Sequence, residues 1–192
     1  ALPSANVLAH ATAQEDRVAA SFVLAYGRLP GAAELESWTK LEPLSMGDLL
    51  SRHRRQIQSD PAAQEGVAAR AALDAFGRAP GQQGPDTRPG GGTYVESMRR
   101  NLRWLAENPA EYQAVLHRAY RLLLGRDAFS IEIDYWKRQP TLSFALLVAC
   151  IEDWARRNQP GLMATTGVAS ASVNSRYLAT VRLSPAVAAE AR

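Results

Sequence analysis

Apolar side chains recur every three or four residues through most of this chain, which is the spacing of one face of an α-helix. The series Val18, Phe22 and Ala25 predicts a long helix that ends at Gly27, because glycine adopts the left-handed conformation of a helix end without a Cβ clash. Similar series predict a short helix that carries Leu35 and Trp38, and long helices that start near Ser45, Pro61, Tyr94, Pro109 and Thr141. The expected fold class is therefore all-α.

A Gly-Arg pair follows three of the predicted helices, at Gly27-Arg28, Gly77-Arg78 and Gly125-Arg126. The glycines are 77 − 27 = 50 and 125 − 77 = 48 residues apart, and a fixed period of this size is typical of repeated helical units. The first and last units also agree beyond the glycine, since a shift of 98 residues places Glu34 on Glu132 and Trp38 on Trp136. The middle unit departs from the pattern at Gly81–Gly92, which has the composition of a loop.

These repeats predict helix-pair units that pack as one bundle or short solenoid over residues 1–160, with units at about 12–58, 60–107 and 108–158. Two units begin with Asp60-Pro61 and Asn108-Pro109, in which a capping side chain precedes a proline that suits the first helical position. Residues 161–192 alternate apolar and polar side chains from Ser175 to Leu183, so we expect an extended C-terminal arm that contains a short strand. A lone strand needs a partner, and the arm residues expected to bind one are Arg176, Tyr177, Val181 and Leu183.

The repeated arginine has two interpretations. Because a glutamate recurs with it, pairing of Arg28 with Glu34 and of Arg126 with Glu132 is favoured over a row of anion-binding guanidiniums. The residues with expected structural roles are Gly27, Arg28, Glu34, Trp38, Gly77, Arg78, Gly125, Arg126, Glu132 and Trp136. Trp104 and Trp154 are also expected to be packed, whereas exposed aromatic side chains would indicate an interface.

Composition narrows the classes of function. The chain has 192 residues, of which 46% are apolar and 21% charged, with a net charge of +3, and these values are typical of a globular protein. The single cysteine, Cys150, excludes an internal disulfide and is expected to be a small buried apolar residue. The longest apolar stretch, Leu142 to Ile151, is too short to span a bilayer, and the N-terminal residues lack a signal-peptide pattern. Whether Ala1 follows removal of a Met or cleavage of a leader stays open.

Catalytic, metal and cofactor motifs do not emerge from the sequence. The histidines at positions 10, 53 and 117 lack the spacing of metal ligands, and a nucleophile motif is missing. Arginine clusters occur at 52–55, 99–103, 118–121 and 156–157, but interspersed acidic residues favour solvated helix faces over a nucleic-acid site. We therefore expect a protein that is not an enzyme and that binds no cofactor.

One stretch carries a specific resemblance. It reads Asn108-Pro109-Ala110-Glu111-Tyr112, then Tyr120-Arg121 through Leu124-Gly125-Arg126-Asp127, then Glu132 and Tyr135-Trp136. This stretch resembles the bacterial family known as domain of unknown function 4214, and the chain is loosely similar to the linker domains of phycobilisomes. The match is good over Asn108–Arg157, fair over Val18–Ile57 and broken over Gly81–Tyr94. The family's usual glycine shortly before the tryptophan is absent here, where the chain has Ile131 to Ile133. The resemblance implies a helical fold and a non-catalytic role, often at the cell surface or in extracellular proteins.

From these observations we expect a non-catalytic scaffold or linker subunit that joins protein subunits in a larger assembly. One alternative is a secreted or cell-surface module associated with carbohydrate or matrix, which exposed tryptophans beside polar clefts would support. Another is nucleic-acid binding, which requires the arginine clusters to share one face. A location in the cytoplasm or at the periphery of a large assembly is slightly favoured over secretion.

Overall fold

The computed structural model describes residues 13–79, 91–159 and 161, and within them every regular element is an α-helix. The helices are α2 (Ala13–Tyr26), α3 (Ala32–Thr39), α4 (Met46–Ser59), α5 (Pro61–Phe76), α6 (Tyr94–Glu107), α7 (Pro109–Leu124), α8 (Ser130–Lys137) and α9 (Phe144–Asn158). The predicted all-α character is thus confirmed for this part of the chain. The predicted strand, the four arm residues and most of the Gly81–Gly92 loop lie outside the described residues.

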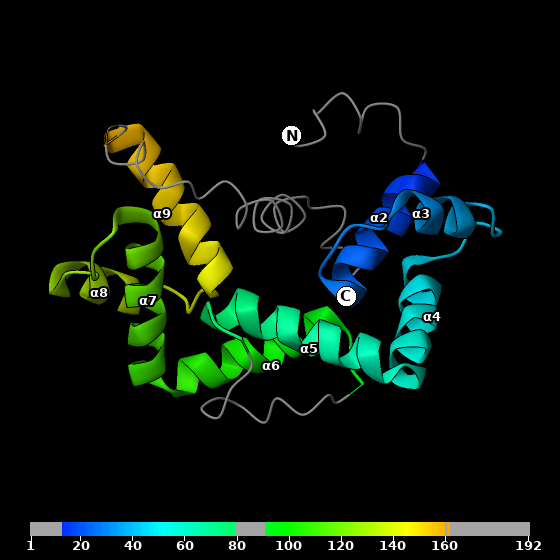
Figure 1. The fold of residues 1–192 in the computed structure, drawn as a ribbon, viewed down its shortest axis with the longest axis horizontal. Coiled ribbons are helices and arrows are strands. Elements are labelled where there is room, and N and C mark those ends of the chain that lie inside the picture. Colours follow the sequence, from blue (N-terminus) through cyan, green and yellow to red (C-terminus); the bar gives the residue numbers. More distant parts are fainter. Residues whose placement is uncertain (1–12, 80–90, 160, 162–192) are drawn as a thin grey trace.

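The helices follow one another in three groups (Figure 1). Helices α2 to α4 form one end, α5 and α6 lie in the middle, and α7 to α9 form the other end. Within each group the first and last helices pack together: α2 on α4, α5 on α6, and α7 on α9. We call these groups the first, middle and last segments. None of the described helices is both long and apolar enough to cross a membrane.

The last helix of each segment buries side chains at matching positions. The buried residues are Leu49, His53 and Ile57 in α4, Ser97, Asn101 and Leu105 in α6, and Leu147, Ile151 and Ala155 in α9. The offsets are 97 − 49 = 48 and 147 − 97 = 50 residues, and all three series recur every four residues as one helix face does. At the matching position the first segment therefore buries His53, whereas the last segment buries Ile151.

Three long helices end in the same way, at glycines with left-handed backbone. The φ angles are 67° at Gly27, 68° at Gly77 and 66° at Gly125. Each amide donates a hydrogen bond to the carbonyl four residues earlier, for example from Gly77 to Leu73 at 2.8 Å. This conformation costs a residue with a side chain about 1–2 kcal/mol, which explains the choice of glycine.

Two of these glycines also lie against an aromatic ring of the following segment. A Cβ atom at Gly27 would be 2.5 Å from Tyr94 Cδ2, and one at Gly77 would be 2.6 Å from Phe144 Cδ2. Tyr94 and Phe144 are the first residues of α6 and α9, so each ring joins one segment to the next. A Cβ atom at Gly125 would meet no described residue within 4 Å.

Two predicted helix starts differ in detail from the structure. Asp60 accepts a hydrogen bond from the Ala62 amide as expected, but the Asn108 side chain instead donates to the Trp104 carbonyl at 2.7 Å. Asn108 therefore stabilises the end of α6 rather than the start of α7. Helix α9 begins at Phe144 and not near Thr141, because the Ser143 hydroxyl accepts the Leu146 amide and acts as the N-cap.

Candidate functional site: an aromatic pocket of the last segment

The first and last segments contain the same turn between their first two helices. Arg28 donates two hydrogen bonds to the Glu34 carboxylate at 2.7 Å each, and Arg126 donates two to Glu132 at 2.8 Å each. Each glutamate also accepts the amide at the start of its short helix, from Gly31 or Phe129, at 2.7 Å. The arginine thereby fixes the short helix to the end of the long one.

The electrostatics of this turn follow from the pairing. The hydrogen bonds from Arg28 lower the pKa of Glu34 to about 2. The hydrogen bonds from Arg126 also lower the pKa of Glu132 below its usual value. At neutral pH both glutamates are therefore ionised, and each forms an ion pair with its arginine. Arg78 of the middle segment contacts Glu111 at 3.4 Å, and Glu111 also accepts a bond from Arg118 at 2.9 Å.

Replacement of Arg126 by lysine is expected to lower the free energy of unfolding by about 1 kcal/mol. Lysine cannot make the two parallel bonds to Glu132, and the arginine and glutamate side chains are 33% and 20% exposed, so solvent screens part of the effect. Urea denaturation followed by circular dichroism measures this change. Lys40→Gln is the control, because its pair with Glu36 is about 70% exposed on both sides and its loss should change stability by less than ~0.5 kcal/mol.

The two expected tryptophan anchors have different surroundings. Trp38 packs over His53 with ring centroids 4.2 Å apart, and it meets Phe22 edge-on at 5.8 Å. Trp136 instead donates a hydrogen bond from its indole nitrogen to the Tyr120 hydroxyl at 3.1 Å. The first segment therefore closes around a buried imidazole, whereas the last segment leaves room beside its tryptophan.

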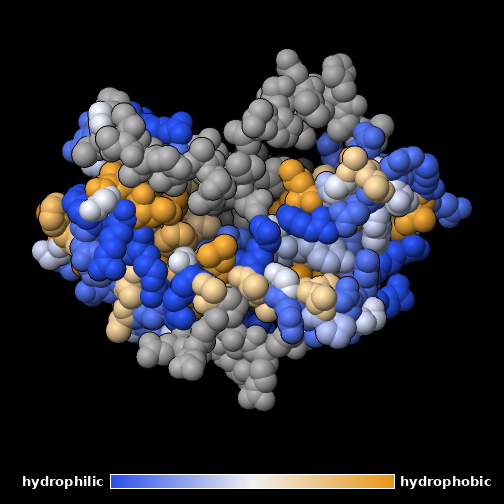
Figure 2. Space-filling view, in the orientation of Figure 1, coloured by the Kyte–Doolittle hydropathy of each residue, from blue (hydrophilic) through white to orange (hydrophobic). Residues whose placement is uncertain are grey.

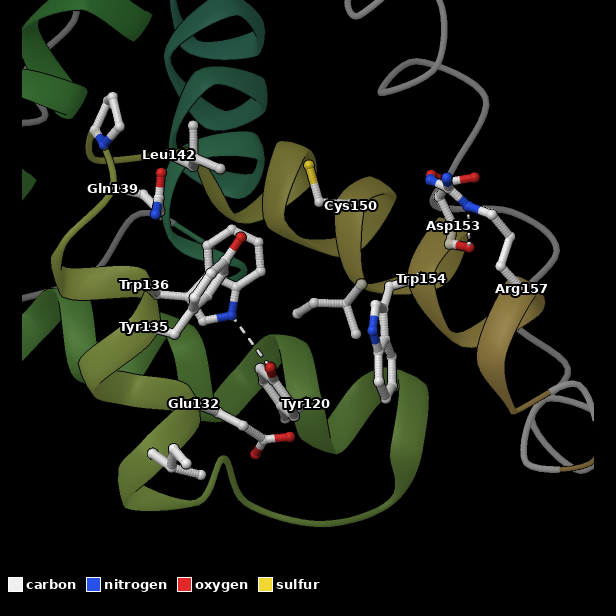
Figure 3. Close-up of a pocket in the computed structure, with 13 residues that line it drawn as sticks. Tyr120, Glu132, Tyr135, Trp136, Gln139, Leu142, Cys150, Asp153, Trp154 and Arg157 are labelled. Carbon is white, nitrogen blue, oxygen red and sulfur yellow. Dashed lines mark hydrogen bonds and ion pairs between the residues drawn. The ribbon is translucent and has the colours of Figure 1, made fainter.

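That room is a pocket of about 720 Å³ between α7, α8 and α9. Figure 3 shows Tyr135 and Trp136 on α8 and Trp154 on α9 beside the same space, with Tyr120 on α7 below them. The other lining residues are Ile131, Glu132, Gln139, Pro140, Leu142, Cys150, Ile151, Asp153 and Arg157. Volume and aromatic lining are those of a typical binding pocket.

Three of the lining side chains are large, apolar and exposed. The exposed fractions are 76% for Ile131, 57% for Tyr135 and 45% for Trp154. Together they form what we call the α8–α9 apolar surface. Figure 2 shows a hydrophobic area over the end of the molecule that α7 to α9 form. Phe129, at the start of α8, is also exposed and lies 4.0 Å from the Arg126 guanidinium.

The prediction that Trp154 is packed is therefore wrong. Its position on α9 faces the pocket rim, and Gln56, the residue 98 positions earlier on α4, is likewise exposed. Trp104 is partly buried as expected, with its ring edge-on to Phe76 at 5.7 Å. Cys150 is only half-buried because it lines the pocket, and burial raises the pKa of its thiol.

The charged groups of the pocket are engaged within the chain. Glu132 holds Arg126, and Asp153 forms an ion pair with Arg157 one turn further along α9. A raised thiol pKa keeps Cys150 protonated near neutral pH, so its sulfur is a poor nucleophile. Among the described residues there is no group of His, Cys, Asp and Glu arranged to hold a metal ion. The pocket therefore suits apolar groups better than ions.

Several arginines of the predicted clusters are paired with carboxylates. In the run 52–55, His53 is buried, and Arg54 pairs with Glu96 of α6. Arg121 pairs with Asp127, Arg156 with Glu152, and Arg157 with Asp153. The clusters at 118–121 and 156–157 are thus largely neutralised by carboxylates, which counts against a phosphate-binding role for them.

The chain was also compared with known proteins. Neither family models, nor curated protein sequences, nor solved structures gave a match.

Proposed function

We propose that this chain is a non-catalytic scaffold built from three related helical units, and that it binds another protein through the α8–α9 apolar surface. The resemblance to domain of unknown function 4214 is part of this proposal, since it implies the same fold and role. The observation that carries the proposal is a comparison within the chain, between the first and last segments.

The two segments place different side chains on the same helical framework. A shift of 98 residues superposes the bounds of α3 on those of α8 and the start of α4 on that of α9. At the three exposed positions of interest, the first segment has Ala33, Ser37 and Gln56, and the last segment has Ile131, Tyr135 and Trp154. The turn, the glutamate and the tryptophan are otherwise alike. The framework therefore does not require large apolar residues there.

Exposed apolar side chains with no structural need indicate a binding surface. Aromatic residues in particular contribute most of the energy of protein interfaces, because they bury a large area with few rotatable bonds. The charged side chains that line the pocket are already paired, so an apolar partner surface can cover the pocket without leaving those charges unpaired. A protein partner with an apolar face meets these conditions best.

A second candidate, carbohydrate binding, is favoured by the exposed Trp154 beside a pocket with polar residues. Sugars stack on exposed aromatic rings but also need hydrogen-bonding groups at their hydroxyls. Here the indole nitrogen of Trp136 and the carboxylates of Glu132 and Asp153 already have partners in the chain. Protein binding is therefore the better-supported function.

The test uses residues taken from the first segment. In the triple variant Ile131→Ala, Tyr135→Ser and Trp154→Gln, the fold should persist because the first segment carries those residues on the same framework. We expect purified native complexes to lose the bound protein in this variant, with an unchanged helical circular-dichroism signal. Leu73→Gln is the control, since Leu73 is 52% exposed on α5 and lies outside the pocket.

A second measurement uses the single cysteine of the chain. Cys150 lines the pocket, so a bound partner should slow its alkylation at least several-fold, and the triple variant should abolish that protection. Retention of the same partners by the triple variant would contradict the proposal. Binding of a polysaccharide that depends on Trp154, with no bound protein, would support the carbohydrate alternative instead.

A further inference from the structure

We propose that the protein bound at the α8–α9 apolar surface is a second copy of this chain, with the two α8 helices antiparallel across a twofold axis. This inference rests on the proposed function, because it names the occupant of the same surface. It is drawn from the charges that flank the apolar residues on α8.

Four residues of α8 and its end share one exposed face: Ile131, Asp134, Tyr135 and Arg138, all exposed. Their spacing of three, four and seven residues places them in one stripe along the helix. Asp134 and Arg138 carry opposite charges, and neither has an ion pair within the described part of the chain. By contrast, the charged residues that line the pocket are paired.

This stripe is complementary to itself when two copies run antiparallel. If Asp134 of one copy faces Arg138 of the other, the axis passes the helix at position (134 + 138)/2 = 136, and the reciprocal pair forms by symmetry. Both unpaired charges then gain a partner. A parallel arrangement would place like charges side by side.

The same register also places Ile131, which is 76% exposed in one chain, against the other copy. Ile131 is five residues before the axis, so it lies past Lys137, the last residue of the other copy's α8. The segment that follows this helix contains Pro140 and Leu142, which line the pocket. Contact of Ile131 with that segment would remove its side chain from water.

Charge reversal tests this register. The single variants Asp134→Arg and Arg138→Asp each place two like charges across the axis, so each should weaken dimerisation at least tenfold in analytical ultracentrifugation. The double variant Asp134→Arg/Arg138→Asp restores opposite charges and should dimerise within about threefold of the natural chain. Circular dichroism on each variant checks that the helices are retained.

Mixing the two single variants gives a sharper result. The mixture unites a chain that is basic at both positions with a chain that is acidic at both, so both cross-axis pairs form in a heterodimer. We expect the mixture to form heterodimers more tightly than either variant forms homodimers, which local effects within one helix cannot produce.

The inference is overturned if the natural chain remains a monomer up to about 1 mM, or if it dimerises and neither single reversal weakens the dimer. If the chain is monomeric but binds a different protein that the triple variant does not bind, the bound protein is not a second copy and the proposed function stands. If the chain dimerises as described but the triple variant retains every other bound protein, the inference stands and the proposed docking of other proteins fails.

Discussion

Replacement of Gly77 by alanine is expected to lower the free energy of unfolding by about 3 kcal/mol or more, whereas the same change at Gly125 should cost about 1 kcal/mol. Both glycines have left-handed backbone, with φ of 68° and 66°, so the backbone cost is shared. Only at Gly77 does the new methyl group meet a ring, since its Cβ would lie 2.6 Å from Phe144 Cδ2. Urea denaturation of the two variants measures the difference.

The ring's contribution can be isolated with Phe144→Ala. In that background the methyl group has space, so Gly77→Ala should cost no more than Gly125→Ala does in the natural chain. Gly27→Ala should resemble Gly77→Ala, because its Cβ would lie 2.5 Å from Tyr94. Equal costs at Gly77 and Gly125 in the natural chain would contradict the close approach of Phe144.

Acidification from pH 7 to pH 4 is expected to remove about 3 kcal/mol of stability through His53 alone. Its ring is fully buried against Phe22, Tyr26 and Trp38, and burial lowers the pKa of His53 from 6.5 to about 4. The folded chain therefore binds this proton less readily than the unfolded chain. The stabilisation is complete above pH 6.5 and is lost as the pH falls toward 4.

The measurement is the free energy of unfolding between pH 4 and pH 7, with His53→Ile as the comparison. Isoleucine suits the site because α9 buries Ile151 at the matching position. Ser21 loses its contact with the His53 ring but keeps its bond to the Val18 carbonyl at 2.7 Å. We expect the variant to lose the pH dependence between 6.5 and about 5, whereas the loss due to Glu34, whose pKa is lowered from 4.5 to about 2, remains below about pH 5. The same slope in both proteins would contradict the assignment to His53.

Much of the helical framework could be predicted from local pattern. Glycines after apolar series locate the ends of α2, α5 and α7, because the left-handed turn is a property of the glycine itself. The recurrence of glutamate six residues after Arg28 and Arg126 likewise indicated the turn contact, which involves only near neighbours in sequence. Contacts of this range leave a local signature.

Contacts between distant residues could not be read in this way. Tyr94 lies 67 residues after Gly27, and Phe144 lies 67 residues after Gly77, so no local pattern links ring to glycine. The sequence did contain one signal: Gly27 and Gly77 are 50 residues apart, and so are Tyr94 and Phe144. The exposure of Trp154 was missed because periodicity identifies the apolar residues of a helix but not which neighbours cover them.

Alignment of the first segment with the last would also have identified the α8–α9 apolar surface. Comparison of Ala33 and Ser37 with Ile131 and Tyr135 shows small or polar residues replaced by large apolar ones on one framework. That substitution is visible in the sequence once the offset of 98 is applied. The empty space beside Trp136 is not visible there, because it depends on how α7, α8 and α9 pack.

Because of the rings that lie against Gly27 and Gly77, each of the first two segments depends on the segment that follows it in the sequence. The turn of the first segment is completed by Tyr94 of the middle segment, and the turn of the middle segment by Phe144 of the last. Gly125 takes no ring from the described residues, so within them this dependence reaches only as far as the last segment. During synthesis the N-terminal part emerges first. The ring contacts at Gly27 and Gly77 therefore form only after the following segment has been synthesised. Local opening of α9 would loosen the middle segment, but opening of α2 would leave the contact of the last segment intact.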